Sequence, residues 1–182
     1  ESLETFPAFP PIILTPKNAA IHLICMLHEN NALTLLNAKN GAAILESELA
    51  SGSPPNHYCV IQGFPESAMA VAIADAEAIS LYNIKGEELV PAWAQQLAGI
   101  TALAPLPNGS GVAIGNSEGD LFAYDLQGNL LWEEHRSAAS ITGIFFYPYP
   151  KVKSACLCVI TSCSNGLRGL KISQTMTIPE KH

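Results

Sequence analysis

One eleven-residue pattern occurs four times in this chain of 182 residues, and it limits the possible fold more than any other feature. Each copy is an apolar segment, then a polar turn, then the first residue of a second apolar segment. The copies align without a gap: LICMLHENNAL (23–33), MAVAIADAEAI (69–79), GVAIGNSEGDL (111–121) and LCVITSCSNGL (157–167). Because their first residues lie 46, 42 and 46 positions apart, the chain is built from a repeated unit of about that length.

The surroundings of each copy predict four short β-strands per unit. After three copies, an alternating strand ends at a polar residue and a glycine follows, as in LTLLNAKNG, ISLYNIKGE and LFAYDLQGN. The polar residues (Asn37, Asn83 and Asp125) can accept hydrogen bonds from the backbone ahead, and the glycines (Gly41, Gly86 and Gly128) can take the positive φ of such a turn. A further short strand follows, and a proline-ended strand precedes three copies. Short apolar segments between regular turn signals favour strands over helices.

A four-stranded unit repeated at this period is typical of a β-propeller blade. One blade cannot bury both of its faces, so blades stack around an axis. We therefore predict an all-β fold, a β-propeller or part of one, in a single domain spanning 1–182. Its units are predicted at 12–52, 57–95, 99–135 and 141–174, the last without its outer strand. PIILTP supplies the first strand, and AWAQQLAG (92–99) is predicted to be a loop between units.

The segment GDLFAYDLQGNLLWEE (119–134) resembles the repeat of quinoprotein-type (PQQ-type) propellers, in which a Gly-x-Leu-x-Ala-x-Asp strand leads to a glycine turn and an outer-strand tryptophan. The matching residues are Gly119, Leu121, Ala123, Asp125, Gly128 and Trp132. Trp93 is the predicted counterpart of Trp132. WD-repeat propellers are the second resemblance, although their Gly-His and Trp-Asp pairs are absent from all four units.

The resemblance implies a toroid of six to eight blades, which is more than this chain supplies. We therefore expect it to be part of a larger propeller, completed by further sequence or by a second chain. The segment ETFPAFPPII near the N-terminus is a candidate closing strand.

Charge and hydropathy exclude several classes of partner. The net charge is −7, and the two arginines, Arg136 and Arg168, are far apart in the sequence. Without clustered basic residues, neither nucleic acid nor an anionic lipid surface is a predicted partner. No apolar run is long enough for a membrane helix. Only 14% of residues are charged and the mean hydropathy is +0.22, so we expect either high burial or apolar surface that a protein partner covers.

The cysteines predict neither a disulfide framework nor a metal site. Their number, five, is odd and their spacing irregular. Cys156, Cys158 and Cys163 could be combined with His135, but cysteines one residue apart on a strand do not have the spacing of a zinc knuckle. We expect buried thiols, which favour the cytoplasm. A processed secreted or periplasmic chain is the alternative, since the sequence begins at Glu1.

No reaction centre is visible in the sequence. Quinone-dependent enzymes of the resembling superfamily carry adjacent cysteines, a divalent cation and a catalytic aspartate. No Cys-Cys pair is present, and the aspartates are Asp75, Asp120 and Asp125, of which the last two are explained by turns. We therefore predict no catalytic, cofactor-binding or metal-binding residue, no cofactor, and a chain that is not an enzyme.

The most aromatic segment is FFYPYP (145–150), in which Phe146 and Tyr149 are the candidate partner contacts. The predicted function is a non-enzymatic β-propeller scaffold that mediates protein–protein interaction within a larger assembly. One such partner would be a chain or segment that completes the propeller. Two alternatives stay open: a fragment of a quinone- or ligand-binding propeller enzyme whose site missing blades complete, and a peptide- or glycan-binding propeller.

Overall fold

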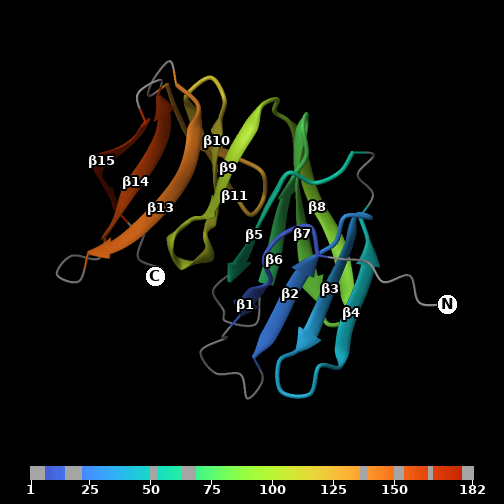
Figure 1. Cartoon of the computed structure of the whole chain (residues 1–182). Coiled ribbons are helices and arrows are strands. Elements are labelled where there is room, and N and C mark those ends of the chain that lie inside the picture. Colours follow the sequence, from blue (N-terminus) through green and yellow to red (C-terminus); the bar gives the residue numbers. More distant parts are fainter. Residues whose placement is uncertain are drawn as a thin grey trace.

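Among the residues that the structure describes, fifteen β-strands form four antiparallel sheets that follow one another along the chain (Figure 1). The structure is a computed structural model that describes residues 7–14, 22–49, 53–62, 69–135, 139–149, 154–163 and 166–177. For residues 147–149, 154–163 and 166–177 it describes the backbone alone. The prediction of an all-β fold with four-stranded blades is confirmed. In the described part of the chain, no helix has the length and hydropathy to span a membrane.

Each sheet is one blade, and its strands pair in chain order. The first blade consists of β1 (Ile12–Leu14), β2 (Leu23–Leu27), β3 (Ala32–Asn37) and β4 (Ala43–Glu48). The second consists of β5 (His57–Gln62), β6 (Met69–Ala74), β7 (Ala78–Lys85) and β8 (Glu88–Gln96). The third consists of β9 (Ile100–Pro105), β10 (Gly111–Asn116), β11 (Asp120–Asp125) and β12 (Leu130–His135), with the short 3-10 helix η1 (Pro107–Gly109) between β9 and β10. The fourth has three strands among the described residues: β13 (Ile141–Tyr149), β14 (Ser154–Cys163) and β15 (Gly166–Thr177).

The sequence repeat corresponds to a repeat in geometry. The first three copies of the pattern begin at the first residues of β2, β6 and β10. In each of these blades the pairing of the third and fourth strands shifts at the same repeat position, after Leu35, Leu81 and Ala123. The residues opposite these positions are Leu45, Trp93 and Trp132. Trp93 is therefore the structural counterpart of Trp132, as predicted.

The ungapped alignment fails in the second and fourth blades. Cys25 pairs with Leu35 and Ala113 pairs with Ala123. In contrast, Leu81 pairs with Ala72 and Gly169 pairs with Ile160, one residue after the position that the alignment gives. The second and third strands of these two blades are joined by one residue fewer than those of the first and third blades. Since a one-residue shift exchanges the two faces of a strand, the side chains of β6 that face the next blade are those of its second, fourth and sixth residues.

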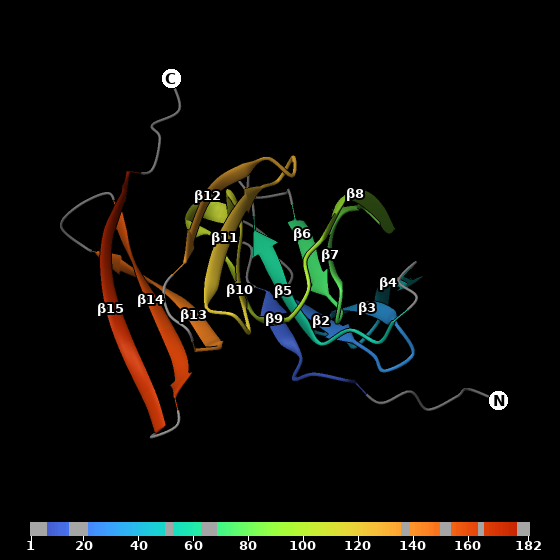
Figure 2. The same cartoon turned by 90° about the horizontal axis from the view of Figure 1, so that it is seen from above.

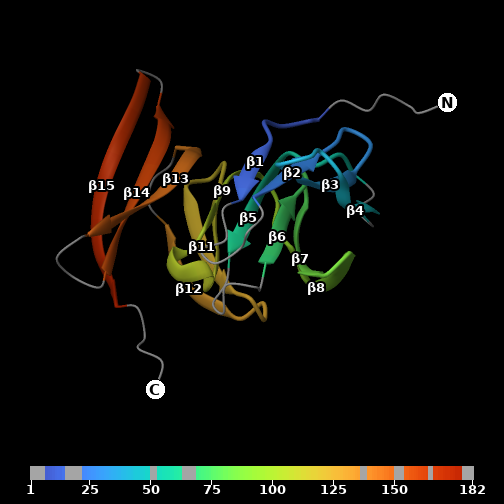
Figure 3. The same ribbon diagram turned by 90° about the horizontal axis from the view of Figure 1, so that it is seen from below.

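The core lies between the blades, in three apolar clusters. The first and second blades share one that includes Leu33 and Val71, and the second and third share one that includes Leu81 and Ile114. The third cluster includes Ile141. Figures 2 and 3 show the sheets side by side in chain order, so the β1–β4 and β13–β15 blades are the two ends of the row. The inner strands β5, β9 and β13 are neighbours, as in a propeller.

The turns between third and fourth strands follow the prediction in part. Gly41, Gly86 and Gly128 have φ of 70°, 63° and 84°. Asn37 and Asp125 accept hydrogen bonds from backbone nitrogens two residues ahead, at 2.9 Å in both cases. Asn83 does not begin a turn: β7 continues to Lys85, and Asn83 pairs with Val90 inside the sheet.

Two further expectations are corrected. The prediction of a loop over 92–99 was wrong for 92–96, because β7 is long enough for Ala78 to pair with Gln96, which keeps β8 extended, and it holds for the turn at 97–99. The described part of the candidate closing strand belongs to the first blade. Ile12–Leu14 is the inner strand β1, and the Ala8 nitrogen donates to the Leu27 carbonyl at 2.8 Å, so this segment runs along β2.

Candidate protein-interaction surface

The turns between second and third strands lie together at one end of the blades, which we call the turn face. It consists of turns 28–31, 75–77 and 117–119 together with Leu49 and residues 97–99 of the connections between blades. Backbone hydrogen bonds link these pieces: Leu97 donates to Glu77, Gly99 to Ala76 and Ser117 to Gly99. In the first blade, Leu49 of the following connection donates to Asn31 in the turn. The turns of the second and third blades are therefore joined through residues 97–99, and the turn of the first blade is joined to the connection that follows it.

Each of these turns is held by a polar side chain that accepts backbone hydrogen bonds. Asn30 Oδ1 accepts from the Ala32 nitrogen at 3.2 Å. Asp75 Oδ1 accepts from the nitrogens of Glu77 and Ala78 at 2.9 and 2.8 Å. Such bonds fix a turn locally and order its tip before any partner arrives.

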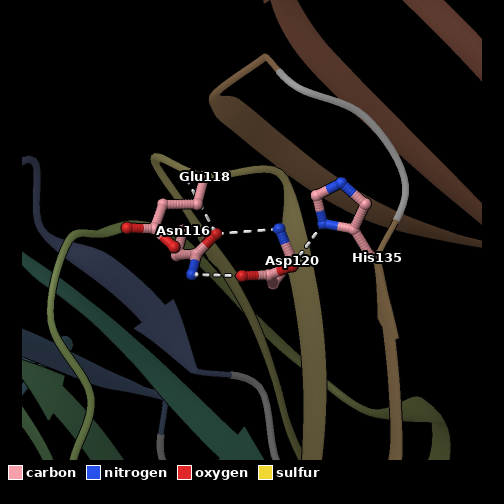
Figure 4. A network of polar contacts seen from close by, with 4 residues as sticks. All are labelled: Asn116, Glu118, Asp120 and His135. Carbon is pink, nitrogen blue, oxygen red and sulfur yellow. Dashed lines mark hydrogen bonds and ion pairs between the residues drawn. The ribbon is translucent and has the colours of Figure 1, made fainter.

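The turn of the third blade carries the most extensive network (Figure 4). Asn116 is buried at the end of β10, and its Oδ1 accepts from the nitrogens of Glu118 and Asp120 at 3.0 and 2.8 Å. Its Nδ2 donates to Asp120 Oδ2 at 3.0 Å. Asp120 Oδ1 in turn accepts from Nδ1 of His135 at 2.6 Å. The network thus joins the turn to the last residue of β12.

Asp120 and His135 form an ion pair at the surface when the imidazole is protonated. Their side chains are 23% and 66% exposed, respectively. The hydrogen bond from His135, followed by the one from Asn116, holds the pKa of Asp120 below its ordinary value. The equivalent pairs are Ala32 with Glu48 and Ala78 with Gln96, so the other described blades lack this pair.

The pH dependence of stability tests this network. A carboxyl whose pKa is lowered by folding contributes stability above its unfolded pKa of about 3.9, and loses that contribution as the pH falls through the lower folded value. Asp120→Asn is therefore expected to be less stable than wild type at pH 7, by at most about 1 kcal/mol because the pair is exposed. Urea unfolding at pH 7 and near pH 2.5 measures this, and the difference in stability between the two proteins should become smaller at the acid value.

His135→Gln is the matched variant, because it removes the imidazole and leaves the carboxylate. His135→Gln should retain the part of the stability that comes from the hydrogen bond between Asn116 and Asp120. A stability difference between wild type and Asp120→Asn that is unchanged near pH 2.5 would contradict the proposed ionic contribution.

The turn face presents an exposed carboxylate in each of the three turns. These are Glu29, Glu77 and Glu118. Lys39 and Lys85 are exposed at the opposite end, in the turns between third and fourth strands. These glutamates were not among the predicted contact residues, although each one falls within the polar part of the aligned eleven-residue pattern.

The aromatic residues proposed as partner contacts lie elsewhere. Phe146 packs in part against the cluster between the third and fourth blades, whereas its neighbour Phe145 is 57% exposed. The backbone of Tyr149 pairs with Ser154 at the end of β13 opposite the turn face, and its side chain lies outside the described residues. A partner contact at Phe146 or Tyr149 stays a prediction.

The described cysteines are buried free thiols. Burial raises the pKa of Cys25 and of Cys59 to about 12, so both are protonated and behave as small apolar groups. The side chains of Cys156, Cys158 and Cys163 lie outside the described residues. Among the residues that are described, no three His, Cys, Asp or Glu side chains are grouped as metal ligands would be.

Comparison with known proteins identifies the fold. No family model and no curated protein matches the chain. It is similar to BBS1N in two crystal structures of its complex with ARL6DN, one soaked with mercury (TM-score 0.70, 21% identity, 94% of this chain, 53% of that chain) and one soaked with lead (0.66, 20%, 90%, 54%). It is also similar to the β-propeller domain of Myceliophteria thermophila Cps50 (Swd1) (0.64, 14%, 88%, 50%).

These similarities show that the chain has a β-propeller fold. The chain spans about half the length of the structures that it matches. Its four blades are therefore consistent with part of a propeller.

Proposed function

We propose that this chain is a non-enzymatic β-propeller scaffold that mediates protein–protein interaction within a larger assembly, and that its turn face binds a basic surface of a partner. The observation that carries the proposal is the set of three ordered turns on one surface, each with an exposed glutamate. BBS1N, which has a similar fold, is found in complex with another protein, ARL6DN. That supports protein binding as a use of this kind of domain.

The physical argument rests on order and charge. Binding is stronger when loops do not lose conformational freedom on association, and the side-chain hydrogen bonds to the turn backbones supply that order in advance. Carboxylates on one face accelerate encounter with a basic partner and select against acidic ones. We therefore expect association that weakens as salt is added.

Neutralising the three glutamates tests the proposal. Affinity purification of the full-length protein from its native source, with cross-linking and quantitative mass spectrometry, measures the proteins bound. We expect E29Q/E77Q/E118Q to reduce the bound partner by about tenfold or more, since several aligned charges are removed together. In the wild-type protein, the cross-links to the partner should lie on the turn face.

A triple variant with the same change in charge serves as control. Glu46, Glu87 and Glu88 are exposed and lie away from the turn face, so E46Q/E87Q/E88Q should retain the partner. The proposal fails if both triple variants lose the partner equally, or if neither loses it while both remain folded.

We also assign the repeat to the quinoprotein type, as a proposal that the two equivalent tryptophans support. The non-enzymatic assignment has its own test. An absorbance spectrum and a metal analysis of the purified full-length protein should contain neither a quinone band nor a stoichiometric divalent cation, and either one would contradict the assignment.

A further inference from the structure

Each end face of the row of blades exposes an apolar residue of its inner strand. In other blades, an inner-strand residue that faces the same way is buried against a neighbouring blade. In the first three blades, the inner strand buries a residue against the following blade: Leu14, Ile61 and Ala104. On β13, Ile144 and Phe146 face back towards the third blade, so Phe145 faces forward, and its side chain is 57% exposed.

The first blade has the reciprocal feature. Ile12 and Leu14 face the second blade, so Ile13 between them faces away, and it is 68% exposed. The residues that face backward on later inner strands, Val60 on β5 and Ile144 on β13, are buried against the preceding blade. Within the part of the chain that the structure describes, no following blade packs on one end of the row and no preceding blade packs on the other.

We propose that these two end faces bind each other between two copies of this chain, so that two rows of four blades close into one ring. The contact would continue the interface already made three times inside each chain, in which a forward apolar face packs on a backward one. The chain matches about half the length of the structures to which it is similar, and a second set of four blades would make a ring of comparable size. A head-to-tail contact that closes after two copies gives a two-fold symmetric dimer.

The mass in solution is the first measurement. The 182-residue chain has a mass of 19.3 kDa, so sedimentation equilibrium should give twice that value. F145E and I13E each place a charge in both contacts of the ring and should raise the dimer dissociation constant by about tenfold or more. Since both positions are exposed in the single chain, urea unfolding of the monomer should change little.

Leu130 provides the matched control. It lies on the outer strand β12, away from the end faces, and is 49% exposed. L130E makes the same kind of change and should leave the dimer intact.

A mixing experiment distinguishes a head-to-tail ring from other forms of association. In a mixture of I13E and F145E chains, one contact of the heterodimer joins intact Phe145 of the first variant to intact Ile13 of the second, and the other contact carries both charges. Each variant alone has a charge in both of its contacts, so only the heterodimer keeps one contact unchanged. The mixture should form heterodimers more tightly than either variant self-associates, whereas the double variant should be monomeric.

Three results would overturn the inference: a wild-type monomer at concentrations up to about 100 µM, equal dissociation by L130E, or open polymers in place of a closed dimer. If other blades complete the propeller, the wild-type chain should be a monomer, which is the first of these results. The turn face is not involved, so these outcomes leave the proposed function untouched.

Discussion

Gly115→Val is expected to lower the free energy of unfolding by about 2–3 kcal/mol. Gly115 lies in β10, where the third blade approaches the fourth. A Cβ atom there would lie 2.5 Å from Cγ2 and 2.8 Å from Cβ of Ile141, which is fully buried at the start of β13. Because Cβ of Ile141 moves only with its backbone, the added side chain must displace the blade. Urea unfolding monitored by circular dichroism measures the loss.

Gly41→Ala is the control for this variant. Gly41 has φ of +70°, and an added Cβ would have no atom within 4 Å. Its replacement should cost only the backbone penalty of the left-handed region, about 1–2 kcal/mol. If Gly115→Val costs no more than Gly41→Ala, the close approach of the two blades is refuted.

Local signals explain why the architecture could be predicted. A strand–turn–strand unit is specified by residues close in sequence. The prediction of the strands and turns therefore depended mainly on the repeat period and the turn glycines. Gly41, Gly86 and Gly128 take the positive φ that the turns require. The repeat also predicts Trp93 as the counterpart of Trp132, and the strand pairing confirms it.

The register within the second blade could not be predicted, because the pattern that specifies it is absent. β6 reads MAVAIA and is apolar on both faces, and every residue after Met69 is buried. With no alternation, nothing in the strand shows which side chains face which neighbour. The shortened turn before β7 then shifts the pairing by one residue.

The two candidate surfaces were missed for a related reason. The sequence indicates alternation in the β13 segment, but not whether Phe145 or Phe146 faces the third blade. Which of the two phenylalanines faces the third blade depends on how Ile144 packs in the cluster between the third and fourth blades. The glutamates of the turn face are about 40 residues or more apart in sequence, and they become one surface only when the blades stack.

Trp93 and Gly128 form the contact that joins the second blade to the turn of the third. A Cβ at position 128 would lie 2.9 Å from Cγ of Trp93, and the φ of Gly128 is +84°. The Trp93 ring also packs against Tyr124, with ring centroids 5.7 Å apart. The absence of a side chain at Gly128 is therefore what allows the indole of one blade to lie on the turn of the next.

A double-mutant cycle tests that contact. Trp93→Ala should lower the free energy of unfolding by about 3 kcal/mol, near the lower end for a large aromatic because the ring is half-buried. Gly128→Ala should lower it by about 2 kcal/mol, from the positive φ and the clash with the indole. In the double variant the clash disappears, so the combined loss should fall short of the sum by about 1 kcal/mol. Urea unfolding of the four proteins measures the coupling, and strictly additive losses would mean that the turn of the third blade does not rest on Trp93.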